Sequence, residues 1–257
     1  MTTATTLDQF YETLAVPDRC VLGKRLFKKQ FYENAQLNVT DRKAFVEDID
    51  SIEWRYTLKP STINIPKFED ETREYLEIAI LQVGLNATGR HGRIAGIMQK
   101  AIPYPVVIVF TDGDKIAINA ADKRINRADA NRIVVETTHD TGWIDLAAPE
   151  PWQAAFLDDF RVTNFSFRDF LAFYGDIVQR IVALNCAVHT GRYELVSGET
   201  ASTTDRLQAL KQIEQLQRED TETRNKLKKE KNMGTQVQLN TRVKEITDRI
   251  EAIKKAM

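Results

Sequence analysis

The sequence has few of the residues that usually build a chemical centre. Among its 257 residues there are only two cysteines, Cys20 and Cys186, and without a secretory signal we expect both to be free thiols. The three histidines, at positions 91, 139 and 189, fall in predicted turns or connections, where a solvated histidine is the ordinary case. Neither set has the spacing of a zinc site, so we predict no metal centre.

Common catalytic motifs are also absent from the sequence. It contains no glycine-rich phosphate loop, no His-Glu-x-x-His, no Cys-x-x-Cys pair and no Gly-x-Ser-x-Gly. We therefore expect no cofactor, with magnesium required only if the nuclease alternative described below holds. The sequence favours a protein without an enzymatic function, although it leaves the class of activity open.

Long hydrophobic runs and a strong net charge are missing as well. The apolar runs are far shorter than the roughly 20 residues that span a bilayer. The first ten residues, MTTATTLDQF, lack the basic and apolar regions of a secretory signal, so we expect a cytoplasmic protein. The formal net charge is −1, which gives no overall attraction to nucleic acid or to a membrane.

The strongest local pattern lies between positions 100 and 126. An unbroken β-branched and aromatic run, VVIVF, is followed by the turn TDGD and by the mixed run KIAINAA. This pattern predicts a β-hairpin with Gly113 at the turn. Because its first strand does not alternate, we expect that strand to be covered on both faces and central in a sheet.

Around this hairpin the sequence predicts an α+β body with a mostly antiparallel sheet and packed helices. Positions 52–58 alternate as a half-buried strand, and positions 75–85 form a second strand that we pair with it. We expect helices over 93–101, 152–160 and 167–187, a largely helical segment over 7–33, and a polar connection over 122–131. The predicted domains are a body over 1–190, a linker over 191–204 and a helical arm over 205–257.

The arm carries the second clear pattern. Apolar residues on a heptad seam step by four, three, four and three, and they are Leu239, Val243, Ile246, Ile250 and Ile253. A Gly-containing break near position 234 predicts two helices in a coiled-coil hairpin; one bent helix in a parallel dimer is the alternative. Residues 203–257 hold 13 Lys or Arg and 9 Asp or Glu, a net charge of +4.

Two further functions remain open as alternatives. A metal-dependent nuclease of the restriction-endonuclease type needs acids on adjacent strands beside a lysine or glutamine, and its weak candidates are Glu77, Gln82, Asp112, Asp114 and Lys115. A nucleic-acid-binding module needs basic residues near aromatic ones, and its weak candidates are Lys24, Arg25, Lys28, Lys29, Lys123, Arg124 and Arg127. In both cases tight-turn chemistry or solvated charge explains the same residues.

Several segments together resemble an uncharacterised bacterial family, a domain of unknown function whose members have about this length. They are IEWRYTLKPSTINI, YLEIAILQVGL, KAIPYPVVIVF and the tail segment KKEKNMGTQVQLN, and KAIPYPVVIVF is the most specific. The resemblance implies a setting beside helicase and DNA-methyltransferase genes in restriction-like or phage-defence loci, and it carries over no catalytic residue. We therefore expect a non-catalytic accessory protein that binds itself, or a partner such as a helicase or methyltransferase, through residues 205–257.

Overall fold

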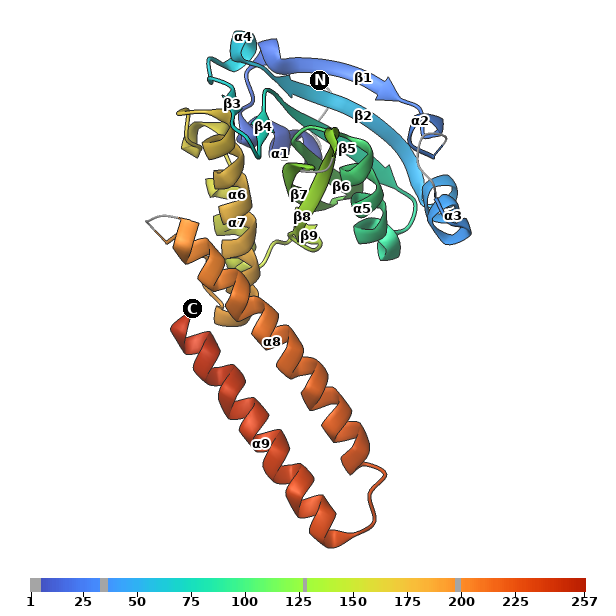
Figure 1. Ribbon diagram of the computed structural model, residues 1–257, viewed down its shortest axis with the longest axis vertical. Helices are drawn as coiled ribbons and strands as arrows, with labels where there is room; N and C mark the ends of the chain where they lie inside the picture. Colours follow the sequence, from blue (N-terminus) through green and yellow to red (C-terminus); the bar gives the residue numbers. More distant parts are fainter. Residues whose placement is uncertain (1–5, 33–36, 127–128, 197–199) are drawn as a thin grey trace. The chain divides into compact units, whose positions relative to one another are not determined.

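The computed structural model describes residues 6–32, 37–126, 129–196 and 200–257 and divides the chain into two compact units (Figure 1). The first unit ends at Ile181 and the second begins at Val182, so the division falls inside one long helix, α7 (Phe170–Thr190). Helix α8 begins at Thr200, so the last five residues of the expected linker are helical.

The first unit is organised by a mixed sheet in the order β1-β2-β5-β6-β7-β8, with the short strand β9 beside β7. All neighbouring strands are antiparallel except β5 and β6, which confirms a mostly antiparallel sheet. A separate two-stranded sheet pairs β3 with β4. The strands are β1 (Val21–Leu26), β2 (Ile49–Leu58), β3 (Phe68–Glu69), β4 (Glu74–Tyr75), β5 (Ile78–Leu85), β6 (Val106–Asp112), β7 (Lys115–Asn126), β8 (Asp129–Asp140) and β9 (Ile144–Asp145).

The predicted hairpin is confirmed as β6 and β7, with Gly113 at a φ of 57° in the turn between them. Strand β6 lies between β5 and β7 and all of its apolar residues are buried, as expected of a central strand. The polar connection expected over 122–131 is wrong, because β7 continues to Asn126 and β8 starts at Asp129. Asp122, Lys123 and Arg124 therefore lie on a paired strand.

The N-terminal region departs from the largely helical prediction. Helix α1 (Thr6–Leu14) is present, but residues 21–26 form β1, which pairs with β2. Gly23, at a φ of 60°, lies where the register between the two strands shifts. Pairing with β2 therefore overrides the helix-like composition of this segment, as tertiary context often does.

Helices lie against both faces of the sheet. On one face α5 packs on a core that includes Phe45, Leu81, Ile108 and Phe110. Helix α7 approaches the other face, where the Tyr174 hydroxyl donates to the Val106 carbonyl and accepts from the Ala121 N–H, both at 2.9 Å. The helices of this unit are α1, α2 (Lys29–Tyr32), α3 (Val39–Glu47), α4 (Pro60–Ile63), α5 (His91–Ala101), α6 (Pro151–Asp159) and the first part of α7.

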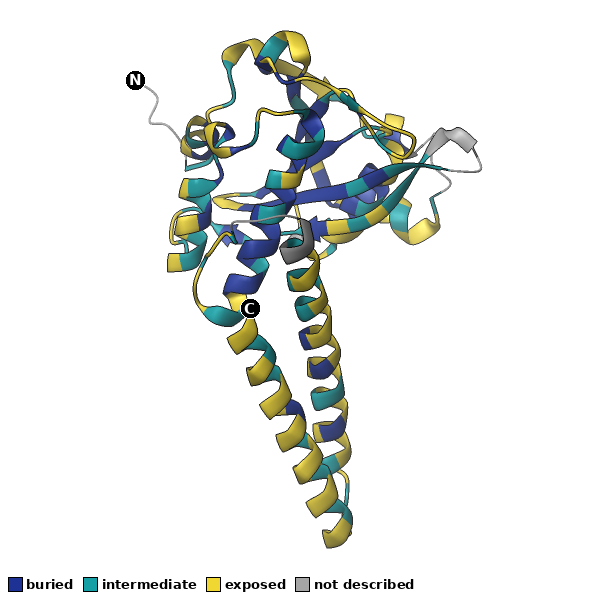
Figure 2. Ribbon diagram, turned by 60° about the vertical axis from the view of Figure 1, so that its left-hand side comes forward, coloured by how far each residue is buried: buried dark blue, intermediate teal, exposed yellow. Residues whose placement is uncertain are grey.

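The second unit contains the end of α7 together with α8 (Thr200–Leu227) and α9 (Met233–Ala256). We call α8 and α9 the helix pair. They run antiparallel, because Arg206 near the start of α8 donates to the carbonyl of Met257 while Arg242 of α9 bonds Glu219 of α8 at 2.9 Å. Figure 2 shows the sheet mostly buried and the helix pair mostly exposed, with isolated buried positions along it.

In the described part of the chain, one helix, α7, is long and apolar enough to cross a membrane. More than half of its most apolar window is buried inside the protein, which is also what the core helix of a soluble fold shows.

Candidate functional site

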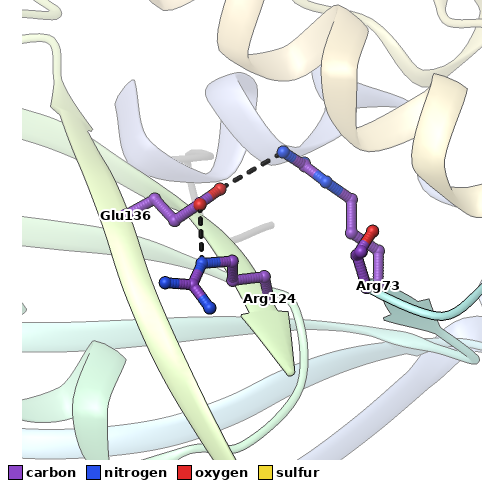
Figure 3. Close-up of a pocket in the computed structure, with 4 residues that line it drawn as sticks. Arg73, Arg124 and Glu136 are labelled. Atoms are coloured by element: carbon purple, nitrogen blue, oxygen red, sulfur yellow. Dashed lines mark hydrogen bonds and ion pairs between the residues drawn. The ribbon is translucent and has the colours of Figure 1, made fainter. Parts of the chain in front are cut away.

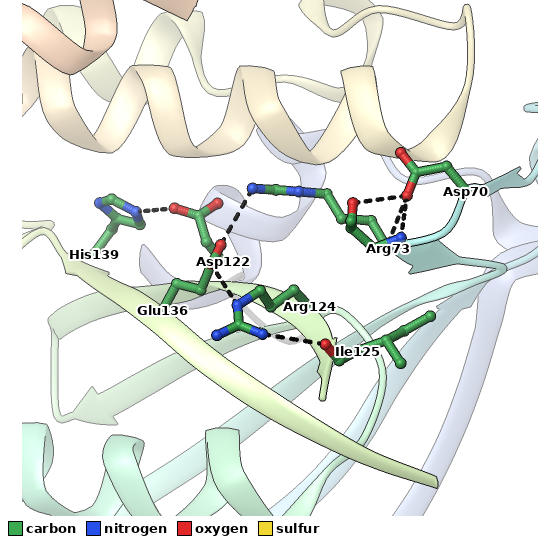
Figure 4. Close-up of polar contacts among 8 residues, drawn as sticks. Asp70, Arg73, Asp122, Arg124, Ile125, Glu136 and His139 are labelled. Carbon is green, nitrogen blue, oxygen red and sulfur yellow. Dashed lines mark hydrogen bonds and ion pairs between the residues drawn. The ribbon is translucent and has the colours of Figure 1, made fainter. Parts of the chain in front are cut away.

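Polar side chains gather on one face of β7 and β8. Because successive residues of a strand point to opposite faces, Asp122 and Arg124 share one face of β7 while Lys123 occupies the other. Glu136 and His139 come from β8, and Arg73 comes from the turn between β3 and β4 (Figure 4). We call these five residues, Arg73, Asp122, Arg124, Glu136 and His139, the β7–β8 cluster.

Glu136 is the centre of the more exposed half of this cluster. Its two carboxylate oxygens accept from Arg73 Nη2 at 3.3 Å and from Arg124 Nε at 2.8 Å (Figure 3). These three side chains and Thr72 line a cavity of about 370 Å³. Two positive guanidinium groups and one carboxylate leave a net positive charge at this cavity. Such a site suits an anionic group better than a cation.

The turn that supplies Arg73 is held in place by its own hydrogen bonds. The Asp70 carboxylate accepts from the N–H groups of Thr72 and Arg73, both at 2.7 Å, and the bonds from Thr72 lower the pKa of Asp70. The carbonyl of Thr72 in turn accepts from the N–H of Ile125 at the end of β7, at 2.8 Å. Arg73 is therefore fixed against β7 by backbone contacts, in addition to its ion pair.

The buried half of the cluster is a carboxylate–imidazole pair. Asp122 Oδ2 and His139 Nε2 lie 2.8 Å apart, and the His139 side chain is only 2% exposed. Tyr75 lies nearby, and its burial, with a smaller contribution from the Asp122 charge, raises its pKa to about 12. The contact joins a side chain of β7 to a side chain of β8, so we assign the pair a structural role in joining the two strands.

A substitution tests how much the ion pairs contribute to stability. We expect Glu136→Gln to lower the free energy of unfolding by only about 0.5 kcal/mol, because all three side chains are about a third exposed and solvent screens them. Urea unfolding followed by circular dichroism measures this change. The matched control is Glu71→Gln, an exposed residue of the adjacent turn. A decrease of more than about 2 kcal/mol in the free energy of unfolding would show instead that these ion pairs behave as buried ones.

A second cluster joins β2, β5 and α1. The Arg55 guanidinium donates from Nη1 to Gln82 Oε1 at 3.0 Å, lies 3.9 Å from Glu53 Oε2, and sits 3.8 Å from the centre of the Tyr11 ring. Glu53 and Gln82 are direct partners in the β2–β5 register. Arg55 therefore occupies the space between the acidic and amide side chains of these adjacent strands.

The nuclease candidates do not come together. Strands β5 and β6 are parallel, with Ala79 opposite Val106 and Gly84 opposite Thr111, so Glu77 and Asp112 lie at opposite ends of the pair. The register places them eight residues apart along the strands, which is about 26 Å at roughly 3.3 Å per residue. Glu77 forms an ion pair with Lys59 at 3.3 Å. Asp114, which lies in the turn just before Lys115, accepts a hydrogen bond from the Thr6 hydroxyl. No group of three His, Cys, Asp or Glu among the described residues could hold a metal ion.

One comparison with known proteins identifies the family of the chain. A family model described as a domain of unknown function, DUF4391, matches residues 14–250. The chain belongs to the DUF4391 family. No curated protein and no solved structure matches it.

For this DUF4391 chain, the resemblance to an uncharacterised domain family is therefore confirmed, over nearly the whole length. The family match assigns no activity and no residue role. The function has to be argued from the geometry of the chain itself.

The basic residues that sequence analysis grouped for nucleic-acid binding are scattered in this DUF4391 fold. Lys24 and Arg25 are exposed on β1, where adjacent positions face opposite sides. Lys28 donates to the carbonyls of Val46 and Ile49, and Lys29 begins α2. Arg127 lies outside the described residues. The candidates on and just after β1 are therefore separated by β2, β5 and β6 from Lys123 and Arg124 on β7.

Lys123 is the clearest correction to that group. Its side chain is 3% exposed, and its ammonium donates to the carbonyls of Ile102 and Tyr104, both at 2.8 Å. Burial lowers its pKa to about 7. The alternation of β7 placed Lys123 and Arg124 on opposite faces, so grouping them as one surface was wrong. Through these hydrogen bonds Lys123 instead links β7 to the connection that follows α5.

Another buried hydrogen-bond network was not predicted from the sequence. Gln99 of α5 donates to Asn119 at 3.1 Å, Asn119 donates to Asp140 at 3.1 Å, and His91 at the start of α5 meets Asp140 at 3.2 Å. Burial alone would raise the pKa of Asp140, but hydrogen bonds from His91, Gly142 and Asn119 lower it overall. Sequence spacing gave no indication of this network, because its members are brought together by the sheet.

The residues of the predicted seam line one side of α9. Ile246 is 1% exposed, while Leu239, Val243, Ile250 and Ile253 are half-buried. On α8 the corresponding buried residues are Ile213 and Leu216. The helix pair thus covers the middle of the seam and leaves its ends partly open.

Proposed function

We propose that this chain is a non-catalytic interaction protein that binds a second copy of itself through the helix pair. The observation that supports the proposal is the incomplete burial of the seam. Six apolar side chains on the facing sides of the two helices are half-buried, and they are Leu207, Leu210, Leu239, Val243, Ile250 and Ile253. Two helices alone bury one side of such a seam, whereas two pairs in a four-helix bundle enclose it, in coiled-coil-like packing.

A second copy fits this surface better than a partner of one charge. Apart from residues 224–231, the region 203–257 contains eight basic and eight acidic residues. Salt bridges along it join residues of opposite sign, such as Arg218 with Glu214 at 2.9 Å. Two copies of a neutral, apolar-striped surface do not repel one another, and most soluble assemblies are closed and symmetric.

Features of the first unit support a role without catalysis. The nuclease candidate Gln82 accepts a hydrogen bond from Arg55, which also lies 3.9 Å from Glu53, so its side chain is engaged within the chain itself. Of the residues suggested for a nuclease, Glu77 is separated from Asp112, Asp114 and Lys115 by the parallel register of β5 and β6. The family resemblance adds a setting: an accessory subunit of a DNA-processing or phage-defence system, beside a helicase or methyltransferase.

The mass of the full chain in solution tests this proposal. We expect light scattering to give twice the monomer mass of 29.4 kDa. The double variant Val243→Gln with Ile250→Gln removes apolar area from the seam and should give a monomer. The matched control, Thr241→Gln with Thr247→Gln, changes exposed positions of the same helix and should remain a dimer. Truncation to residues 1–200 should also give a monomer.

Two results would count against self-association. A full chain that is monomeric at high micromolar concentration lacks the proposed partner. A dimer that survives in both the Gln variant and the truncated chain uses a different surface.

A further inference from the structure

The end of the helix pair is strongly basic. Helix α8 ends at Leu227 and α9 begins at Met233, so residues 224–231 form the turn between them together with the last turn of α8. We call this segment, RNKLKKEK, the tip. It holds five basic residues and one acid, a net charge of +4. The whole region 203–257 also has a net charge of +4, so all of its excess positive charge lies at the tip.

Acidic neighbours do not neutralise these charges. Arg224 is paired with Asp220 at 2.6 Å. The four lysines of the tip are exposed and form no ion pair with any described residue. These lysines are Lys226, Lys228, Lys229 and Lys231. The one acid of the tip, Glu230, directs its carboxylate to the N–H groups of Lys231 and Asn232, both at 2.8 Å. Glu230 therefore shapes the turn and leaves the lysine ammonium groups free.

Basic residues elsewhere on the helix pair are not clustered in this way. Lys211, Lys244, Arg249 and Lys255 are exposed as well, but they are spread along the two helices, and other basic residues are paired. Arg242 bonds Glu219 and Glu245, and Lys254 bonds Glu251 at 2.9 Å. A solvated helix face usually carries such mixed pairs. Four unpaired lysines within six residues are instead a local concentration of charge, which attracts a polyanion.

We propose that the tip binds the phosphate backbone of double-stranded nucleic acid without reading its sequence. Lysine ammonium groups act as compact point charges for phosphate, and exposed lysines need no fixed geometry to neutralise it. Residues 203–257 contain no Phe, Tyr or Trp, so the tip has no ring on which an unpaired base could stack. The same lack of aromatic residues removes the usual anchors for a membrane interface.

This surface differs from the one suggested by the sequence, and it does not depend on self-association. The earlier candidates lie in the first unit, whereas the tip belongs to the second. Contacts to phosphate release counterions, so four lysines predict that log K falls with log salt with a slope of about −3.6. A fourfold increase in salt should therefore weaken binding by about 150-fold.

The test uses the full chain and a short fluorescein-labelled DNA duplex, with fluorescence anisotropy measured over a series of potassium chloride concentrations. The tip variant combines Lys226→Gln, Lys228→Gln, Lys229→Gln and Lys231→Gln. The matched control combines Lys211→Gln, Lys244→Gln, Arg249→Gln and Lys255→Gln, which removes the same charge from exposed positions along the helices. Circular dichroism checks that both variants keep their helices.

We expect the wild type and the control to bind with the same slope, and the tip variant to lose at least 100-fold in affinity at low salt with a slope close to zero. Equal losses in the two variants would overturn the proposal, because total charge would then explain binding. A tip variant that binds like the wild type would overturn it as well. So would a wild type that ignores DNA but binds vesicles of phosphatidylcholine and phosphatidylserine. Light scattering on the same samples separates these results from any failure of self-association.

Discussion

Replacing Ile246 by aspartate is expected to separate α8 from α9. Ile246 is 1% exposed and packs where Ile213 and Leu216 are buried on α8. A carboxylate at this position loses its hydration and gains no partner, so it should cost about 4 kcal/mol in the free energy of unfolding of the second unit. Urea unfolding followed by far-ultraviolet circular dichroism should show the helices melting at lower denaturant, ahead of the sheet.

The neighbouring position provides the matched control. Thr247 is exposed, and Thr247→Asp adds the same charge one residue along the same helix. It removes one hydrogen bond from the Thr247 hydroxyl to the Val243 carbonyl, so we expect a loss of no more than about 1 kcal/mol. Equal effects of the two substitutions would mean that α9 does not pack on α8 through Ile246 in solution.

The stability of the first unit is expected to rise with pH because of Lys123. Its pKa is lowered to about 7 by burial, whereas the unfolded chain has an ordinary lysine value near 10.5. Between these values the unfolded state binds more protons than the folded state, so raising the pH favours folding. The contribution is fully present above about pH 10.5 and is lost as the pH falls to about 7, which gives a gain of roughly 2.5 kcal/mol between pH 6 and pH 9.

Comparison with Lys123→Met isolates this contribution from other groups that titrate in the same range. The variant keeps the length of the side chain but leaves the carbonyls of Ile102 and Tyr104 without donors, so at pH 9 it should be less stable by about 2 kcal/mol. Towards pH 6 the difference should shrink or reverse. Lys115→Met, an exposed position of the same strand, serves as control. Parallel pH profiles for wild type and Lys123→Met would contradict the lowered pKa.

Local sequence patterns predicted the elements whose contacts are mostly local. The run 106–110 and the turn glycine specified the β6–β7 hairpin, because the two strands are adjacent in the chain. The heptad steps likewise include Ile246, the buried residue of α9, since a helix fixes which residues share a side. Strand β1 was missed because its composition resembles an amphipathic helix, and only pairing with β2 makes it a strand.

The polar clusters could not be predicted in the same way. Glu136 meets Arg73 across 63 positions of sequence, and no spacing rule relates a turn before β4 to the middle of β8. The parallel direction of β5 and β6 separates Glu77 from Asp112, and the sequence alone does not show that these strands are parallel. Alternation along one strand was available, however, and it separates Lys123 from Arg124 once β7 is recognised as a strand.

The edge of the sheet gives Lys24 and Arg25 a role that needs no ligand. Strand β1 is the first strand of the sheet and pairs on one side only with described residues, and Val21 and Leu22 are about half exposed there. An open, apolar edge is a template on which a strand of another molecule can add. The irregular register at Gly23 and the two positive charges that follow it interrupt that template. Charged side chains at an open edge disfavour the addition of another strand, which gives these two exposed residues a structural explanation without a ligand.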